Sequence, residues 1–148
     1  MNKESIAALA KLGNLRPKQK DMQLIKSMIN AAEMNARVAK RIPLTDDSAT
    51  LIFDGVYDSI RKLGTAKWLL TGYELTSAPG NHELCLSILK EMDIKDKIKL
   101  NFLERFRMTR HDEQYRAFKV SVPQTKEIID FWGSCGKEIV QILLKELK

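Results

Sequence analysis

The sequence predicts an all-α protein, an up-and-down antiparallel bundle of about five helices preceded by a short N-terminal helix. Through most of the chain, apolar residues recur three and four positions apart, which is the spacing of one buried helix face. Segments that alternate like a strand are too short, Val120-Ser121-Val122 being an example, so no strand is expected. Short connections between the helical segments favour antiparallel neighbours.

The first half of the chain is expected to form three helices. They span residues 4–12, about 18–41 and about 49–72. Gly13 ends the first helix and begins a linker to Pro17, and Pro43 ends the second because its ring disfavours a helical residue before it. Cap candidates for the third helix occupy residues 45–48.

Three further helices are expected after a loop over residues 73–80. They span residues 81–92, about 95–118 and 121 onward. Asn81 is a candidate cap for the first of them, and Ser121 with Gln124 forms a capping-box pattern at the start of the last. Gly133 and Gly136 weaken the middle of that last helix and mark a candidate kink.

Size and composition favour one globular domain with an anionic partner. The chain has 148 residues, of which 44% are apolar and 30% charged, a mixture typical of a folded rather than a disordered chain. Its net charge of +6 favours nucleic acid or a nucleotide, although many proteins that bind neither have a similar excess. We divide the chain into an N-terminal helix and linker, residues 1–17, and the helical bundle, residues 18–148.

Neither a metal ion nor another cofactor is expected. Cys85 and Cys135 are far apart and form no Cys-x-x-Cys pair, and with only His82 and His111 the chain has too few histidines for a multi-histidine site. His82 follows the candidate cap and is expected to be a surface or capping neighbour. No signal peptide opens the chain and no apolar run of about 18 residues occurs, so we expect a cytoplasmic protein without a membrane partner.

The segment from Arg105 to Arg116 has the strongest functional pattern. The apolar stripe of its helix stops at Phe106, and six polar residues follow without a break from Thr109 to Gln114. Arg107, His111 and Tyr115 form one row four residues apart, with Arg110 and Gln114 beside them. Arginine binds phosphate with a permanent charge and histidine titrates near neutral pH, so this face is a candidate phosphate-handling surface. The alternative is a solvated basic face that Asp112 and Glu113 partly neutralise.

Three features of the chain resemble the HEPN superfamily, the higher eukaryotes and prokaryotes nucleotide-binding domains. Arg110-His111-x-x-x-Tyr115 lies near the end of the fourth long helix and is similar to the family's motif of an arginine, a polar residue, about three further residues and a histidine. The expected helix from Ala49 that closes with Gly72-Tyr73 resembles the family's second helix. His82-Glu83-Leu84 resembles the start of its third helix, and the likeness spans about residues 18–147.

The resemblance implies a homodimer in which the two fourth long helices face each other across a cleft. Active members of the family are metal-independent ribonucleases. By this likeness Arg110 would hold the scissile phosphate, His111 would be the acid–base group, and Tyr115 stands where the family's histidine is usually found. The arginines of the segment would bind phosphate or RNA: Arg105, Arg107, Arg110 and Arg116.

Tyr115 departs from the family's pattern. The ordinary pKa of a tyrosine, about 10, makes it a poor base at neutral pH, so cleavage would be weak or absent. A second alignment of the motif pairs Arg105 with His111 as the acid–base group and leaves Arg107 and Arg110 on the phosphate. We prefer the alignment of Arg110 with Tyr115 because it preserves the polar second position.

The sequence therefore leads to three functional hypotheses. The first is a HEPN-type RNA- or nucleotide-binding domain that acts as a metal-independent ribonuclease, or as its degenerate relative in a toxin–antitoxin pair. The second is a non-catalytic helical module whose partner is a small nucleotidyltransferase. The third is a helical dimer whose polar face is only solvated.

Overall fold

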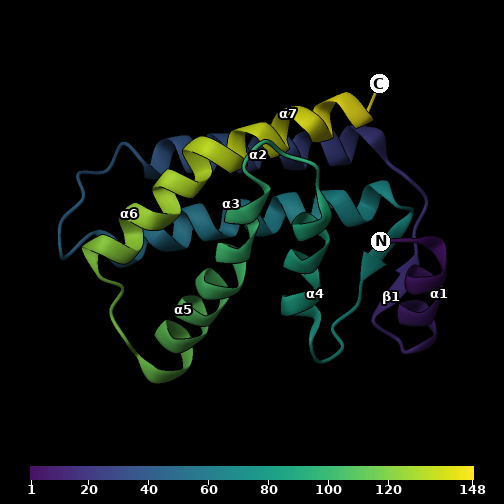
Figure 1. Cartoon of the computed structure of the whole chain (residues 1–148), viewed down its shortest axis with the longest axis horizontal. Helices are drawn as coiled ribbons and strands as arrows, with labels where there is room; N and C mark the ends of the chain where they lie inside the picture. Colours follow the sequence, from purple (N-terminus) through teal and green to yellow (C-terminus); the bar gives the residue numbers. More distant parts are fainter.

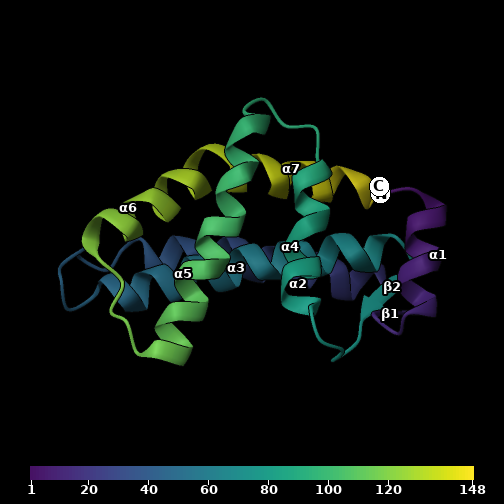
Figure 2. The ribbon, with the colours of Figure 1, turned by 60° about the horizontal axis from the view of Figure 1, so that its bottom comes forward.

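The computed structural model describes all 148 residues and has the all-α bundle that the sequence predicts. Its helices are α1 (Lys3–Lys11), α2 (Met22–Ala39), α3 (Ala49–Leu70), α4 (Asn81–Ser87), α5 (Phe102–Arg116), α6 (Val122–Phe131) and α7 (Lys137–Glu146). Figure 1 shows α2, α3 and the joined α6 and α7 along the length of the molecule, with α4 and α5 running across them. Figure 2 shows α4 and α5 side by side in front of α3, while α1 lies at one end.

Short turns of other helical types join these elements. They are the 3-10 helices η1 (Ile88–Glu91) and η2 (Lys97–Asn101) and the π-helical turn η3 (Trp132–Gly136). The fourth long helix therefore begins later than the sequence predicts, because the residues before Phe102 form η2 instead of α-helix. The predicted kink in the last helix corresponds to η3. A Cβ atom on Gly136 would lie 2.5 Å from the ring of Trp132, so a larger residue does not fit there.

The expectation that the chain has no strand was wrong. Strands β1 (Leu15–Pro17) and β2 (Tyr73–Leu75) pair antiparallel, with Leu15 opposite Leu75. β1 occupies the predicted linker and β2 the start of the predicted loop. This two-stranded sheet fastens the N-terminal segment to the end of α3, and the buried side chain of Leu15 joins the core.

The predicted helix caps have mixed outcomes. The capping box at Ser121 is confirmed: its Oγ accepts from the backbone N–H of Gln124 at 3.2 Å, and Gln124 accepts from the backbone N–H of Ser121 at 3.0 Å. Asn81 is not a cap, because Gly80 occupies that position with φ 86° and the Asn81 side chain contacts Asn14 and Thr76 instead. Ser48 lies at the cap of α3 without making a cap hydrogen bond.

The core surrounds α3 and fixes the positions of α4 and α5. Trp68 is fully buried, and its Nε1 donates to the carbonyl of Leu84 in α4 at 3.0 Å. Phe106 of α5 packs edge-on against Phe53 of α3 and Phe131 of α6, with centroid distances of 6.4 and 5.4 Å. These contacts leave the face of α5 beside its buried stripe directed toward α4. None of the helices is both long and apolar enough to cross a membrane.

Candidate functional site

A cavity of about 230 Å³ lies where α3, α4 and α5 meet. Helix α5 contributes the row and the neighbouring side chains that the sequence analysis singled out: Arg107, Arg110, His111, Gln114 and Tyr115. Helix α3 contributes Tyr57 and Arg61, and the start of α4 contributes His82 and Glu83. Most of the lining is therefore polar, and three arginines face a single carboxylate within it.

The packing of α5 explains why these side chains converge. Leu103 and Phe106 are buried in the core, so the residues beside them on the helix face the space in front of α4. Helix α4 approaches α3 closely at Gly64, where a Cβ atom would lie 2.3 Å from the carbonyl oxygen of Cys85. This close contact holds α4 against α3 next to the cavity.

Arg110 is surrounded by carboxylates. Its Nη1 lies 3.1 Å from Asp58 Oδ1 and 3.5 Å from Asp54 Oδ1, and its Nε lies 3.8 Å from Glu113 Oε2. The guanidinium also stands over the ring of Tyr57, 5.3 Å from its centroid. Only 16% of the side chain is exposed. Its charge is thus largely compensated within the protein, which favours a positioning role for Arg110 as much as direct contact with a ligand.

The carboxylates around Arg110 do not all behave as ordinary acids. Burial and, after it, a hydrogen bond with Glu113 raise the pKa of Asp54, whereas Arg110 lowers it, and the net pKa is about 7. A protonated Asp54 can donate to Glu113, so near neutral pH the cluster holds a proton. Burial likewise raises the pKa of Tyr57 to about 12, which makes its hydroxyl a donor rather than a base.

Arg107 is less compensated than Arg110. Glu104 accepts from its Nη2 at 2.6 Å and from its Nε at 3.2 Å. This pairing raises the pKa of Arg107 and lowers that of Glu104. Arg107 has a single close carboxylate partner and lines the cavity, so its charge is available to an anion there.

His111 and Tyr115 lie at the rim of the cavity. Their rings are 4.7 Å apart between centroids, and His111 Nδ1 lies 3.8 Å from Asp112 Oδ1. His111 is half exposed, and 75% of Tyr115 is exposed. Both side chains can therefore meet a ligand that enters from solvent.

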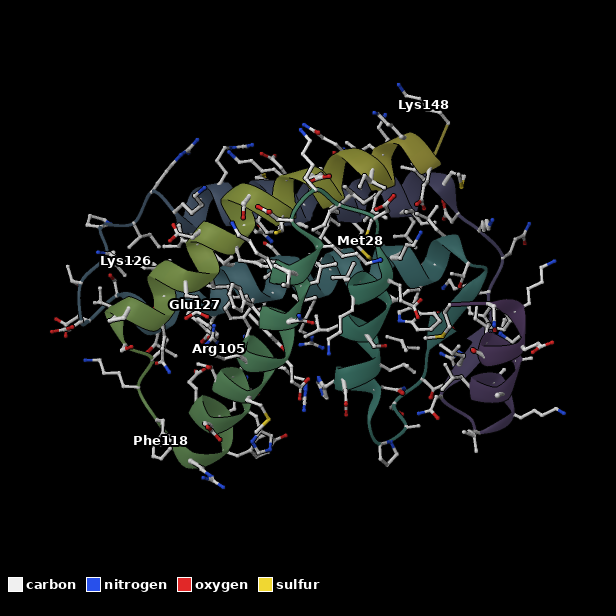
Figure 3. All side chains as sticks on the ribbon, in the orientation of Figure 1. Met28, Arg105, Phe118, Lys126, Glu127 and Lys148 are labelled. Atoms are coloured by element: carbon white, nitrogen blue, oxygen red, sulfur yellow. The ribbon has the colours of Figure 1, made fainter.

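The two other predicted phosphate-binding arginines lie outside the cavity. Arg105 points to α6, where it pairs with Glu127, as the labelled side chains in Figure 3 show. Its guanidinium also stands 4.8 Å from the centroid of the Phe102 ring. Arg116 is mostly exposed at the end of α5, 3.9 Å from Asp112.

The contributions of α3 and α4 to the cavity were not predicted from the sequence. Arg61 follows Tyr57 by one helical turn, and its buried Nε has no hydrogen-bond partner. His82 is exposed, as expected of a surface residue, and it also lines the cavity. Partial burial lowers the pKa of His82, and the charges of Arg61, Arg107 and Arg110 lower it further, which favours the neutral imidazole at pH 7. In the sequence, the only feature that points to Arg61 is its place on the side of α3 away from the apolar stripe.

No family model matches the chain, and no curated protein or solved structure is significantly similar to it. The likeness to HEPN domains therefore remains a prediction from the residues quoted above. No group of three or more His, Cys, Asp or Glu side chains is arranged so that it could hold a metal ion.

Proposed function

We propose that this protein is a HEPN-type domain that binds the phosphate of RNA or of a nucleotide in the cavity between α3, α4 and α5. The observation that carries the proposal is the convergence of the predicted row Arg107, His111 and Tyr115 with Arg61 and His82 on one cavity. A site of this kind holds anions through permanent guanidinium charges and keeps titratable groups beside them.

The distribution of charge favours a phosphate in front of Arg61 and Arg107. Arg110 is held by three acidic side chains, whereas Arg107 has Glu104 alone and Arg61 forms no ion pair. A phosphate in the cavity would supply the counter-charge that the Arg61 guanidinium lacks. Arg110 would then orient Gln114 and Tyr57 at the back of the site.

The reaction we propose is metal-independent cleavage of RNA by its own 2′-hydroxyl. The 2′ oxygen attacks phosphorus, a P–O2′ bond forms and the P–O5′ bond breaks, which leaves a 2′,3′-cyclic phosphate. A base takes the 2′-hydroxyl proton and an acid protonates the leaving 5′ oxygen. His82 is neutral at pH 7 and can accept the first proton, and His111 at the rim can supply the second. Tyr115 would bind the RNA beside His111 rather than act as a base.

Incubation with a mixed-sequence RNA in the presence of EDTA tests this reaction. Wild type is expected to produce 2′,3′-cyclic phosphate ends, and His111→Gln is expected to reduce the rate at least about 100-fold while it retains RNA binding. His82→Gln should cause a similar loss of rate.

If wild type binds RNA without cleaving it, the protein would be a binding module and not a ribonuclease. Cleavage that is unchanged in both histidine variants would place the activity elsewhere, for example in a contaminating nuclease.

A partner module is the second candidate function. Met108 and Tyr115 are two turns apart on α5 and both exposed, and Phe118, which is 57% exposed, follows the end of the helix (Figure 3). Exposed apolar side chains along one helix and just after its end favour contact with another chain. We propose a second copy of this protein as that chain, which would make a homodimer through α5. A small nucleotidyltransferase of a toxin–antitoxin pair is the alternative. An absence of both RNA binding and cleavage would favour this candidate.

A further inference from the structure

A second and larger cavity, of about 480 Å³, lies beside the first. It is bounded by α2, by α3 and by the segment that runs from β2 into α4. Arg61 and His82 line both cavities, so the two spaces meet at these side chains. Because Arg61 also lines the second cavity, a ligand there can place its charged end against this guanidinium.

The two cavities differ in the chemistry that they offer. The first is small and lined mainly by charged and polar groups. The second falls within the usual range of small-molecule sites, about 300–1,000 Å³, and has an apolar portion. That portion is formed by Leu24, Met28, Leu69, Leu75 and Ala78. The pair of cavities thus matches a molecule with a phosphate at one end and a larger, partly apolar group at the other.

Arg61 lies between the two cavities, and its guanidinium is free to bind an anion. Its Nε is buried and lacks a hydrogen-bond partner, and no carboxylate lies within ion-pair distance of the guanidinium. A guanidinium that lines a cavity without an ion-pair partner is a favourable place for an oxyanion. This arrangement favours a phosphate at Arg61 over a phosphate deeper in the cavity at Arg110.

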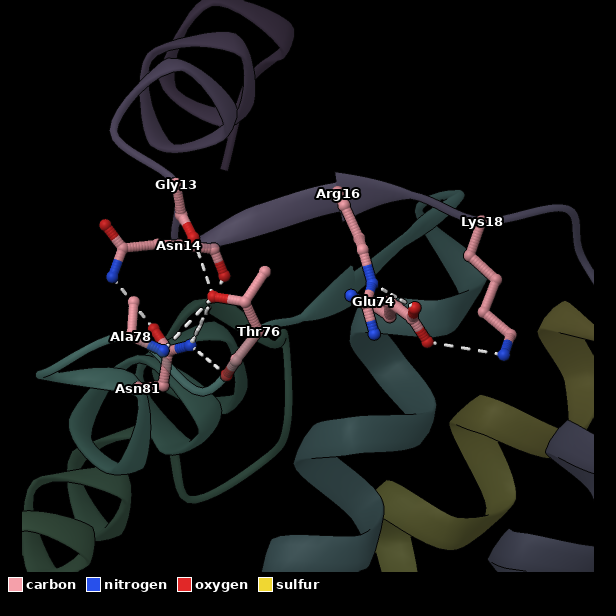
Figure 4. Close-up of polar contacts among 8 residues, drawn as sticks. All are labelled: Gly13, Asn14, Arg16, Lys18, Glu74, Thr76, Ala78 and Asn81. Atoms are coloured by element: carbon pink, nitrogen blue, oxygen red, sulfur yellow. Dashed lines mark hydrogen bonds and ion pairs between the residues drawn. The ribbon is translucent and has the colours of Figure 1, made fainter.

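The outer wall of the second cavity is held in place by the contacts drawn in Figure 4. Thr76 Oγ1 donates to the carbonyl of Gly13 at 2.6 Å and accepts from the backbone N–H of Ala78 at 3.2 Å. The amides of Asn14 and Asn81 bond at 2.9 Å across the same wall. Further along, Glu74 pairs with Lys18 at 3.3 Å. A wall that is ordered before binding lowers the entropic cost of taking up a ligand.

We propose that the second cavity binds the nucleoside part of a nucleotide unit whose phosphate lies at Arg61. This inference rests on the proposed function, since it assumes that the first cavity binds phosphate. It adds that the protein also recognises the base and ribose of the nucleotide. Arg61 and the cavity wall at Ala78 would then determine the affinity for the nucleotide.

Calorimetric titration of the full chain with three probes tests the inference. The probes are inorganic phosphate, adenosine and the four nucleoside monophosphates. We expect wild type to bind at least one monophosphate ten times or more tightly than it binds phosphate or adenosine. Ala78→Trp, which fills the second cavity, should bring that monophosphate to the affinity of phosphate and leave phosphate binding unchanged. Leu12→Trp, at an exposed site away from the cavity, is its control.

Charge is tested by a matched pair on α3. Arg61→Ala should weaken both phosphate and monophosphate at least tenfold, whereas Lys62→Ala removes the same charge outside both cavities and should change neither. Arg61→Lys keeps the charge without the guanidinium and should retain part of the affinity, which controls for misfolding of the alanine variant.

The possible results separate this inference from the proposed function. Equal affinity of phosphate and monophosphates, with binding lost in Arg107→Ala, would overturn the nucleoside cavity and leave the phosphate site standing. Binding of no probe would overturn both. If a tetranucleotide of single-stranded RNA binds more tightly than any monophosphate, the nucleotide that the protein recognises is part of an RNA chain.

Discussion

At the scale of single residues, the cluster around Arg110 joins the electrostatics of the site to the stability of the fold. Asp54, Asp58 and Glu113 meet one guanidinium, so acidic groups outnumber the cation that they share. Burial and the bond to Glu113 hold the Asp54 pKa near 7, against its ordinary value of 3.8. In the folded protein this carboxyl thus keeps a proton that the unfolded chain releases.

This proton makes the stability depend on pH in a definite direction. Between 3.8 and about 7 the folded state binds more protons at Asp54 than the unfolded state does, so the contribution of this group falls as the pH rises through that window. We expect Asp54→Asn to remove this component and to flatten the change in the thermal midpoint between about pH 5 and about pH 8. Asp47→Asn, at a fully exposed side chain, is the control and should follow wild type. An unaltered pH profile in Asp54→Asn would show that Asp54 is an ordinary surface acid.

At the scale of elements, the sequence predicted the helices but not the sheet. The helices follow from local apolar spacing, and the capping box from four adjacent residues. The strands could not be predicted, because Leu15 pairs with Leu75 across most of the N-terminal half of the chain and neither segment alternates. Contacts of that sequence separation depend on how α2 and α3 pack.

The candidate site, too, could be predicted from the sequence only in part. Arg107, His111 and Tyr115 could be grouped from the sequence because they share one face of a single helix. Arg61 and His82 could not, since their meeting with α5 requires the close packing of α4 on α3. Arg105 was included by its nearness in sequence, although its helix directs it to α6.

The close approach of α3 and α4 gives a prediction about Gly64. Gly64→Ala places a methyl group 2.3 Å from the Cys85 carbonyl oxygen, so the helices must separate. We expect a loss of about 1–3 kcal/mol in the free energy of unfolding, measured by urea denaturation. The control is Gly133→Ala, where no atom lies within 4 Å of the new methyl group and alanine should cost nothing. Equal stability of the two variants would contradict the close packing of α4 on α3.

At the scale of the whole molecule, the net charge of +6 attracts nucleic acid without specifying where it binds. Arginines on α5 occur both inside and outside the cavity. Attraction of RNA by overall charge and binding of RNA in the cavity therefore predict different effects when single arginines are removed. Arg105 and Arg107 are two residues apart on one helix and each has a glutamate partner. Removal of either changes the net charge by the same amount, but only Arg107 lines the cavity.

The affinity of a fluorescent single-stranded RNA for wild type, Arg105→Ala and Arg107→Ala, measured at one salt concentration, tests the central claim most directly. If phosphate binds in the cavity, Arg107→Ala weakens binding about tenfold or more and Arg105→Ala leaves it close to wild type. Equal losses in both variants would mean that the RNA is attracted by surface charge alone. Unchanged binding in Arg107→Ala would remove the cavity between α3, α4 and α5 from the function of this protein.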